Sequence, residues 1–236
     1  MKNILITGCS RGIGFETVKK FAIIDDVNIL AVARNSNALD KLKLECKNIN
    51  HKCNIHTLSI DLSEPDSFNI VANYIKNNNI GTLDVIINNA GLLINKSFSE
   101  ITLADLEGSF KVNAYAPFLL TQKLMPFFSD NAHTIFISTM GGIQGSLKFP
   151  GLSAYSSSKS TLMTLTECLA EEYKSSDWVF NCLALGAVQT EMLEQAFPGY
   201  QAPLSAQEMA IYIYDFALNG KRYFNGKIIP ISLTTP

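Results

Sequence analysis

The stretch "TGCSRGIG", residues 7–14, decides the fold of this chain. It follows the apolar run "NILIT" (3–7) directly and opens an amphipathic pattern. Glycines at 8, 12 and 14 allow a tight turn and close backbone approach to a pyrophosphate, and the N-terminus of the following helix would supply unpaired N–H groups with partial positive charge. Similar glycine spacing also arises from simple turn chemistry. Between a strand and a helix, however, it predicts dinucleotide binding.

Strand and helix patterns alternate along the rest of the chain. Nearly continuous apolar, β-branched runs, as expected for strands covered on both faces, lie at 3–7, 27–33, 54–60, 83–89, 133–138, 178–185 and 226–232. Amphipathic stretches separate them near 13–24, 36–48, 64–78, 103–128, 153–175 and 205–218. This order predicts an α/β fold, a Rossmann-like doubly wound parallel seven-stranded sheet with helices on both faces, in a single domain over residues 1–236. Ligands bind such sheets at the carboxyl ends of the strands.

Composition and charge argue against several classes of protein. The net charge is −2 and the sequence has no Lys/Arg block, which disfavours nucleic-acid binding. The longest apolar run, "WVFNCLALGAV" (178–188), is interrupted by Asn181 and is too short to span a bilayer. "MKNILITG" becomes strand-like by Asn3, which leaves no room for a targeting peptide, so a cytoplasmic protein is expected.

The cysteines predict neither disulfides nor a metal site. The five cysteines are odd in number and form no C-x-x-C pair, which argues against a disulfide framework. Cys46, His51, Cys53 and His56 are metal-ligating types close together in sequence. The paired short spacings of structural zinc are missing, so a helix end running into a strand is the better interpretation, and no metal is expected.

Local signals refine the helices. Ser63 before "EPD" (64–66) and Thr102 with Asp105 have the pattern of helix N-termini. Pro117 falls inside the 103–128 pattern and predicts a kink there.

"YSSSK" (155–159) places a tyrosine and a lysine one helical turn apart. A free tyrosine has a pKa near 10 and is a poor proton shuttle at pH 7. A lysine on the same helix face would stabilise the phenolate and lower the pKa of Tyr155. The spacing also fits a solvated helix start, but the dinucleotide-binding turn gives a reason for an acid/base pair. The intervening serines, 156–158, read as small residues that allow close helix packing.

Together with "NNAG" (88–91) and Tyr155/Lys159, the G-x-x-x-G-x-G turn resembles the short-chain dehydrogenase/reductase family over essentially the whole chain. Further matches are Asp61, Asn113 and "GAVQTEM" (186–192). The resemblance implies that Tyr155 protonates a substrate carbonyl oxygen while a nicotinamide delivers hydride to the carbon. It also implies that Lys159 holds the nicotinamide ribose and that Asn113 supports a proton relay through water.

The resemblance further implies that residues 1–130 mainly bind the cofactor, whereas 131–236 supply the catalytic residues and a substrate loop. Asp61 and Leu62 would meet the adenine, and Thr190 the nicotinamide amide. The expected cofactor contacts come from the glycine turn, the strand ends and the Tyr/Lys pair: Gly8, Ser10, Arg11, Gly12, Ile13, Gly14, Arg34, Asp61, Leu62, Asn89, Ala90, Gly91, Gly186, Val188, Thr190, Tyr155 and Lys159.

Two arginines bear on the choice of cofactor. An acidic residue at the end of the second strand would select NAD, yet that strand ends "AVARN" (31–35), with Arg34. Arg11 adds a cation inside the glycine turn, and the planar guanidinium suits phosphate. Solvated surface arginines are the alternative. NADP(H) is therefore favoured over NAD(H).

The sequence departs from the family pattern at two positions of the expected site. Where the family has a catalytic serine after the fifth strand, alignment puts Thr139, with Ser138 as the fallback. The family's Pro-Gly after the sixth strand is Leu185-Gly186. "GSLKFPG" (145–151) is expected to form part of the substrate wall, and 191–204, with Met192, Leu193, Phe197 and Tyr200, an apolar lid or else a helix packed on the core.

These observations predict an NADP(H)-dependent oxidoreductase acting on a small, fairly apolar carbonyl or alcohol. A nicotinamide-sensing or protein-interaction module that keeps the fold without turnover is the alternative from another class. Reduction of an acyl-carrier-protein thioester ranks lower, because Lys148 is the only cation in the 139–155 segment. By family resemblance the helices at 103–128 and 153–175 would pair between subunits of a homodimer or homotetramer.

Overall fold

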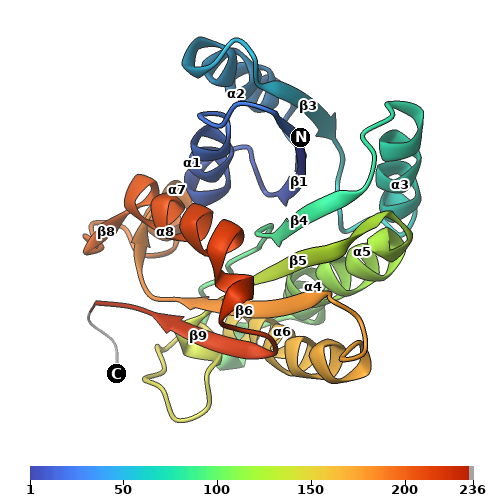
Figure 1. Ribbon diagram of the computed structural model, residues 1–236. Coiled ribbons are helices and arrows are strands. Elements are labelled where there is room, and N and C mark those ends of the chain that lie inside the picture. The colour runs from blue at the N-terminus through green and yellow to red at the C-terminus, as the bar shows by residue number, and fades with distance from the viewer. Residues whose placement is uncertain (234–236) are drawn as a thin grey trace.

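The computed structural model describes residues 1–233, which fold around a parallel sheet of seven strands in the order β3-β2-β1-β4-β5-β6-β9 (Figure 1). The sequence prediction of a single doubly wound α/β domain is confirmed. The strands of this sheet are β1 (Lys2–Thr7), β2 (Val27–Ala33), β3 (Asn54–Ser59), β4 (Leu83–Asn88), β5 (Phe128–Thr139), β6 (Val179–Leu185) and β9 (Lys227–Ile231).

Helices cover both faces of the sheet, as Figure 1 shows. Side chains of three helices pack on one face: α1 (Gly12–Phe21), α2 (Ser36–Ile49) and α8 (Ala206–Asn219). Those of three others pack on the opposite face: α3 (Ser67–Asn77), α5 (Ala116–Leu124) and α6 (Ser153–Glu172). Each strand must therefore be apolar on both sides, which explains the near-continuous apolar runs.

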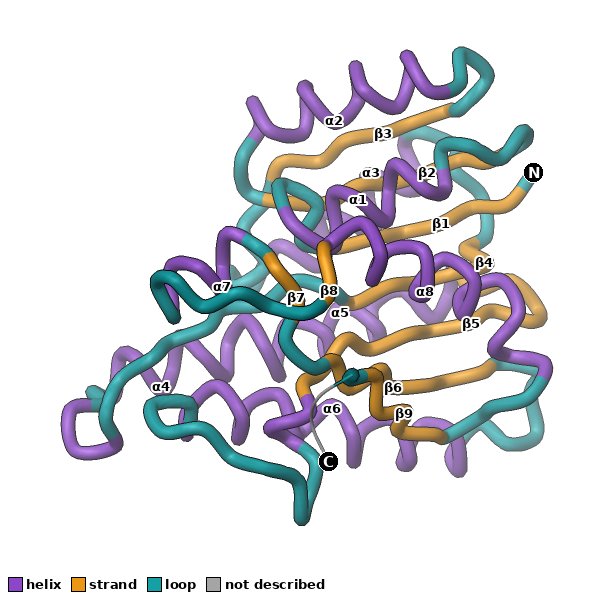
Figure 2. Tube along the Cα trace, turned by 90° about the vertical axis from the view of Figure 1, so that its left-hand side faces the viewer, coloured by secondary structure: helices purple, strands orange, loops and turns teal. Residues whose placement is uncertain are grey.

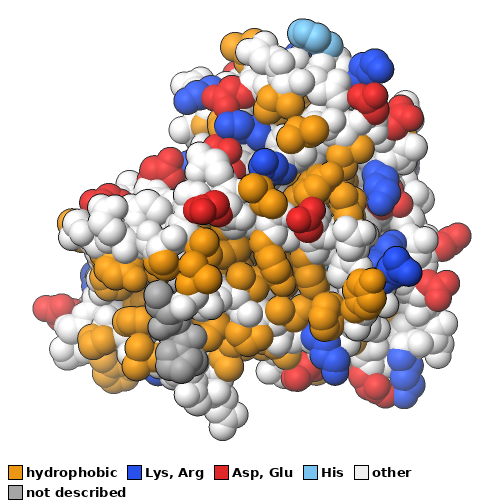
Figure 3. Space-filling view, turned by 60° about the vertical axis from the view of Figure 1, so that its left-hand side comes forward, with side chains coloured by type: hydrophobic (Ala, Val, Ile, Leu, Met, Phe, Trp, Pro, Cys, Tyr) orange, Lys and Arg blue, Asp and Glu red, His pale blue; other side chains and the backbone are white. Residues whose placement is uncertain are grey.

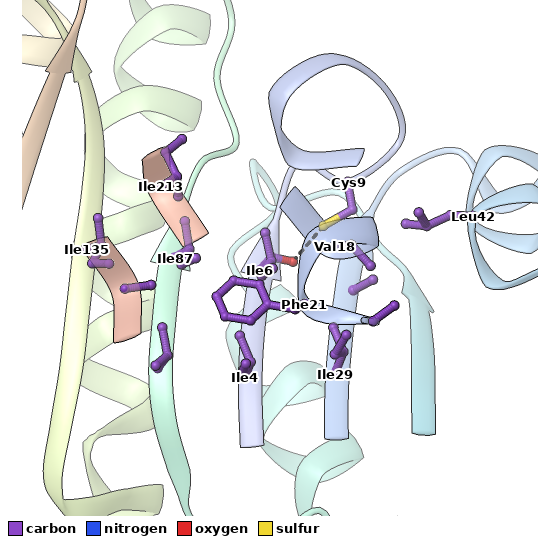
Figure 4. Close-up of a cluster of buried hydrophobic side chains, with 14 of the residues drawn as sticks. Ile4, Ile6, Cys9, Val18, Phe21, Ile29, Leu42, Ile87, Ile135 and Ile213 are labelled. Atoms are coloured by element: carbon purple, nitrogen blue, oxygen red, sulfur yellow. Dashed lines mark hydrogen bonds between the residues drawn. The ribbon is translucent and has the colours of Figure 1, made fainter. Parts of the chain in front are cut away.

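The two-residue period of a strand divides the core between these faces. Ile4 and Ile6 of β1 pack with Phe21 of α1, whereas Leu5 between them packs on the opposite side. Figure 4 shows this first cluster, in which the thiol of Cys9 also donates a hydrogen bond to the Ile6 carbonyl at 3.0 Å. Burying such side chains contributes roughly 1.5–3 kcal/mol each, so the sheet core supplies most of the driving force for folding.

Strand order places the candidate site. β1 pairs in parallel with β2 on one side and with β4 on the other, so the connections from β1 and from β4 leave in opposite directions across the sheet. A crevice opens at the carboxyl ends of the strands at such a switch point. The glycine turn follows β1 at this position. In Figure 2, α7 (Glu191–Ala196) and the short pair β7 (Val188–Gln189) and β8 (Leu204–Ser205) lie beyond these strand ends.

Most predicted helices are confirmed, but the start of α3 was predicted too early. Its N-cap position is Asp66, and Ser63 does not cap it. The Ser63 hydroxyl and N–H instead donate to Asp61 Oδ1 at 2.8 and 2.9 Å, because the chain is still turning after β3. The Thr102/Asp105 capping box at the start of α4 (Leu103–Phe110) is confirmed.

The predicted 103–128 helix is interrupted where Pro117 predicts it. After α4 the chain makes a π turn (Lys111–Tyr115), then α5, a 3₁₀ turn (Met125–Phe127) and β5, which begins earlier than predicted. A proline has no N–H for the carbonyl four residues before it, here Asn113, and its ring crowds that carbonyl. The helix widens instead, and the N–H of Ala116 bonds to the Lys111 carbonyl.

The Cys/His group near β3 is dispersed. Cys46 and Cys53 are buried in the hydrophobic core beside α2, whereas His51 is exposed. Within residues 1–233 no group of three or more His, Cys, Asp or Glu side chains has the arrangement of a metal site. None of the helices in this range is both long and apolar enough to cross a bilayer.

His133 lies fully buried at the junction of β5, β6 and α8. Its Nδ1 is 3.1 Å from the Ala217 carbonyl, which can only accept, so Nδ1 carries the proton. Its Nε2 then accepts from Asn181 Nδ2 at 3.1 Å. Burial lowers the pKa of His133 to about 4.

This histidine predicts a loss of stability in mild acid. Because the folded pKa lies below the ordinary 6.5, the unfolded chain binds the proton first, and stability falls as the pH drops from 6.5 towards 4. The full loss is about 3 kcal/mol. Urea unfolding at pH 7, 5 and 4 would measure it. His133→Gln should flatten this pH dependence, whereas the exposed control His51→Gln should keep it; equal slopes for wild type and His133→Gln would contradict the assignment.

Candidate active site

A cavity of about 400 Å³ opens at the carboxyl ends of the strands, below α7. All but two of the predicted cofactor and catalytic residues line it; Gly14 and Asn113 do not. Segments far apart in sequence meet here, including the glycine turn, the "NNAG" stretch and the start of α6. The solvated-helix interpretation of "YSSSK" is wrong, since Ser158 and Lys159 are buried.

The glycines of the turn are required by backbone shape and by space. Gly8 and Gly12 adopt φ of +74° and +57°, a region that disfavours side chains. Gly14 has no such φ, but a Cβ there would lie 2.5 Å from Asn89 Nδ2 and closer still to the Gly8 carbonyl. The turn is therefore packed against itself with no room for a methyl group.

The "NNAG" stretch holds this turn. Asn89 Nδ2 donates to the Thr7 and Gly8 carbonyls at 2.9 and 3.3 Å. The Thr7 hydroxyl oxygen accepts from the N–H groups of Asn89 and Ala90 at 3.1 and 3.0 Å. Asn89 thus buttresses the turn in addition to lining the cavity. Thr7 was missed in the sequence, where its only signal was its place at the end of β1.

The N-terminus of α1 is suited to an anion. Among the described residues no side chain caps it, and its first turn contains no Asp or Glu. Unpaired N–H groups and the helix dipole attract phosphate at such a position. The absence of Cβ atoms along Gly8 and Gly12, with Gly91 on the adjoining wall, leaves the backbone open to close approach. These residues fit the pyrophosphate of a dinucleotide.

The two arginines both reach the cavity. Arg34 Nη1 pairs with Asp61 Oδ2 at 3.5 Å, and Arg11 Nη2 donates to Gln195 Oε1 of α7 at 3.3 Å. Burial acts to raise the pKa of the Asp61 carboxyl, but the hydrogen bonds from Ser63 and the charge of Arg34 outweigh it and hold the pKa below its usual range. Arg34 is 72% exposed, so its pairing with Asp61 is weak and its guanidinium can turn to a phosphate.

Tyr155 and Lys159 lie in the cavity wall, but the pKa shift predicted for the phenol is wrong in direction. Burial raises the pKa of Tyr155 to about 12. The Lys159 ammonium donates to the carbonyls of Ile137 at 2.8 Å and Ala90 at 3.4 Å, which directs its charge to the strand ends. Burial lowers the pKa of Lys159 to about 8. In the protein without ligands Tyr155 is therefore a neutral phenol at pH 7.

The lowered pKa of buried Lys159 predicts that this residue reduces the stability of the fold at neutral pH. Since the folded pKa of about 8 lies below the unfolded value of 10.5, charged Lys159 destabilises the fold at pH 7, and stability rises as the pH rises from 8 to 10.5. Lys159→Met should therefore stabilise the protein at pH 7, by at most about 3 kcal/mol and by less because two carbonyls lose a donor. Thermal unfolding at pH 7 and 10 would show a gain that shrinks with pH. A variant less stable than wild type at pH 7 would contradict this account.

The two candidate hydroxyls at the end of β5 differ in direction. The Ser138 hydroxyl is buried and donates to the Lys159 carbonyl at 2.9 Å, whereas Thr139 is partly exposed. Thr139 Oγ1 accepts from the Gly141 N–H at 3.4 Å, which leaves its own O–H free to donate. This geometry favours Thr139 as the hydroxyl that meets a ligand.

Asn113 is fully buried in the π turn. Its Oδ1 accepts from the Leu92 N–H at 2.8 Å. Its Nδ2 donates to the Leu92 carbonyl at 2.8 Å and to the Ser158 hydroxyl at 3.0 Å. The side chain is thus fully used within the protein.

The 191–204 segment covers the cavity and includes the short helix α7. Thr190 caps this helix by accepting from the Leu193 N–H at 3.2 Å. Besides Arg11–Gln195, Asn95 Nδ2 donates to the Ala196 carbonyl at 2.7 Å, so both sides of the cavity hold α7. Apolar side chains line the cavity from this segment and from the predicted substrate wall: Met192, Leu193, Phe197, Tyr200 and Phe149.

Some lining residues had no sequence signal, because isolated apolar residues in loops carry no motif. They are Leu92, Leu93, Val112 and Leu152. A Cβ at Gly186 would clash with Ser232, so this position requires glycine. The chain thus keeps the glycine of the family's Pro-Gly pair although Leu185 stands in place of the proline.

Comparisons with known proteins agree on one family. The family model for short chain dehydrogenases matches residues 2–201. The 3-oxoacyl-[acyl-carrier-protein] reductase FabG of Aquifex aeolicus (strain VF5) is 28% identical over 97% of this chain and 94% of its own. Estradiol 17-beta-dehydrogenase 11 of Homo sapiens is 30% identical, but the match covers 72% of this chain and only 55% of that protein.

Among solved structures, a short chain dehydrogenase from Shigella flexneri 2a str. 301, complexed with NADP, superposes with a TM-score of 0.85. It is 26% identical, and the match covers 97% of this chain and 96% of that chain. The family match over most of the chain, the parallel seven-stranded sheet and the cavity lined by the glycine turn and Tyr155/Lys159 lead to one conclusion: the chain belongs to the short-chain dehydrogenase/reductase family of oxidoreductases.

Proposed function

We propose that this protein transfers a hydride between NADP(H) and a small carbonyl or alcohol, with Tyr155 as general acid/base assisted by Lys159. The observation that carries the proposal is that the glycine turn, Arg11, Arg34, Tyr155 and Lys159 line one cavity. Residues 1–130 would mainly hold the cofactor, and 131–236 would supply catalytic residues and the substrate loop.

In the proposed mechanism a bound reduced nicotinamide supplies the hydride. Tyr155, a neutral phenol at pH 7, donates its proton to the substrate oxygen as negative charge develops there. Thr139 donates a second hydrogen bond to that oxygen. The Lys159 ammonium, beside Gly91, stabilises the phenolate left behind.

Asn113 would support the return of a proton through its backbone. Pro117 cannot supply the N–H that an α-helix would offer to the Asn113 carbonyl, so this carbonyl is the atom proposed to hold a relay water, behind the cavity wall that Asn113 does not itself line. The side-chain amide has no capacity left for that task.

Apolar side chains of the 145–204 loops support an apolar substrate, because Phe149, Phe197 and Tyr200 line the cavity. Thioester substrates on an acyl carrier protein receive less support, because Lys148 is the only cation in the 139–155 segment. Lys148 is exposed, and its ammonium donates to the Ser146 carbonyl and hydroxyl at 3.0 and 2.8 Å.

The direct test is oxidation of NADPH, with NADH in parallel, against a panel of apolar ketones, aldehydes and oxo esters. Turnover that prefers NADPH would support the proposal. Tight NADPH binding without turnover across the panel would instead favour the sensing module.

Arg34→Ala tests the choice of cofactor. If Arg34 holds the 2′-phosphate, its loss should weaken NADPH binding about 10- to 100-fold, the value of charge-assisted hydrogen bonds to a phosphate, and leave NADH binding nearly unchanged. Quenching of protein fluorescence by each nucleotide would measure both affinities. The exposed control Arg222→Ala should alter neither. Equal weakening of NADPH and NADH would argue against a role for Arg34 in selection.

Self-association as a homodimer or homotetramer and a cytoplasmic location stay predictions. Exposed apolar side chains around α4 and α5 offer a surface for the first: Leu103, Leu106, Tyr115, Phe118 and Leu119. Figure 3 shows a second apolar region on the side of the molecule that carries α8, where Ile211 and Tyr212 are exposed. Sedimentation of the purified protein would test the assembly.

A further inference from the structure

A buried chain of hydrogen bonds links Leu92 to Tyr155. The Leu92 N–H donates to Asn113 Oδ1 at 2.8 Å, and Asn113 Nδ2 donates to the Leu92 carbonyl at 2.8 Å. The second hydrogen of Nδ2 goes to the Ser158 hydroxyl oxygen at 3.0 Å. Ser158 in turn donates to the Tyr155 carbonyl at 2.9 Å. Each polar atom of the Asn113 and Ser158 side chains thus has a hydrogen-bond partner within this bridge.

The bridge lies behind the cavity wall. Asn113 and Ser158 are both 0% exposed, and neither lines the cavity. Leu92, at one end, continues the proposed cofactor wall of Ala90 and Gly91, and Tyr155 is at the other end. A Cβ at Gly91 would lie 3.4 Å from both Asn113 Oδ1 and Lys159 Nζ, so Gly91 packs against the bridge on one side and against the lysine on the other.

We propose that Ser158 is a positioning residue: with Asn113 it ties the backbone of Tyr155 to that of Leu92 and so fixes the phenol relative to the cofactor wall. This inference rests on the proposed function. It replaces the interpretation of Ser158 as merely a small residue that allows close helix packing. A serine is needed because its hydroxyl accepts from the amide and donates to the carbonyl at once, which strengthens both bonds.

Removal of the hydroxyl leaves a buried donor without its acceptor. In Ser158→Ala one hydrogen of Asn113 Nδ2 loses its acceptor. An unpaired buried donor is costly, so the Asn113 side chain is expected to move towards another acceptor. Leu92 is held by the same amide, so a shift of Asn113 moves the wall and the phenol relative to each other. Ser157 is the matched control, since it is the adjacent residue, is exposed and has no part in the bridge.

The experiment compares steady-state turnover and NADPH affinity of the full-length wild type, Ser158→Ala and Ser157→Ala. Ser158→Ala should lower kcat about 10-fold or more, while its Kd for NADPH stays within about 3-fold of wild type. Ser157→Ala should match wild type in both. Ser158→Cys, which fills the same space with a weakly hydrogen-bonding thiol, should fall between Ser158→Ala and wild type.

Two further measurements separate positioning from general damage. In a double-mutant cycle, Asn113→Ala and Ser158→Ala should cost less together than the sum of their separate costs, because they break one bridge. Amide hydrogen exchange at Leu92 should quicken in Ser158→Ala and stay unchanged in Ser157→Ala.

Different results overturn different claims. An active wild type with Ser158→Ala equal to Ser157→Ala in kcat and in Leu92 exchange would overturn the positioning role alone. Equal losses of kcat and NADPH affinity in Ser158→Ala would also overturn it, since they would indicate general disruption of the site. A wild type without turnover on any carbonyl would overturn the proposed function and the catalytic part of this inference with it, whatever the exchange data show.

Discussion

Tyr155→Phe is expected to lower carbonyl reduction about 100- to 10,000-fold, the range that a general acid contributes. The substitution removes one oxygen and leaves the ring, so packing around the cavity wall is retained. Since the phenol is neutral at pH 7, the variant loses the proton donor without changing the charge of the site. The affinity for NADPH should therefore stay within about 3-fold of wild type.

The measurement is single-turnover oxidation of NADPH with a saturating carbonyl, together with nucleotide titration. Tyr212→Phe on α8, which lies outside the cavity, is the control for loss of a phenolic hydroxyl. Turnover by Tyr155→Phe within a few-fold of wild type would rule out the proposed acid and direct attention to the hydroxyl of Thr139.

Gly14→Ala should produce the second large effect. The added methyl group would lie 2.5 Å from Asn89 Nδ2 and 2.9 Å from the Gly8 carbonyl carbon, so the turn and the end of β4 have to separate. Overpacking of this kind costs about 1–3 kcal/mol of stability. A displaced turn that loses one hydrogen bond to a phosphate, worth about 1.5–3 kcal/mol, should weaken NADPH binding about 10- to 100-fold.

Thermal unfolding and NADPH titration would measure both effects. Gly108→Ala in α4 is the matched control, because a Cβ there meets only Leu92 Cδ2 at an ordinary 3.5 Å and alanine favours the helix. Normal NADPH affinity in Gly14→Ala would mean that the cofactor does not depend on the backbone shape of this turn.

The strands, the glycine turn and the Tyr155/Lys159 pair could be predicted from the sequence, because each depends on residues that are close together in the chain. Nearly continuous apolar, β-branched runs indicate strands, and the glycine turn between β1 and α1 follows from neighbouring residues. Tyr155 and Lys159 share a helix face because four residues make about one turn. The prediction failed at α3, where Ser63 bonds to Asp61 instead of capping the helix. Both possible partners of Ser63 lie close to it in sequence, so residue spacing does not distinguish them.

Most features that direct the chemistry could not be predicted, because they depend on contacts between residues far apart in sequence. Ser138 and Thr139 are adjacent in sequence, and only the position of α6 decides that the Ser138 hydroxyl is used on the Lys159 carbonyl, 21 residues away. The pKa of Tyr155 moved opposite to the prediction because helix spacing shows neither that the phenol is desolvated in the cavity wall nor that the Lys159 ammonium bonds to the carbonyls of Ile137 and Ala90.

By itself, therefore, the sequence determined the doubly wound sheet, the glycine turn and the pairing of Tyr155 with Lys159, since each depends on repeating or closely spaced residues. Only the tertiary structure decided the direction of each hydroxyl, the contacts of α7 with both sides of the cavity and the bridge through Asn113. The bridge joins residues 21 and 45 positions apart, and burial, which sets its strength, is a property of the packed chain.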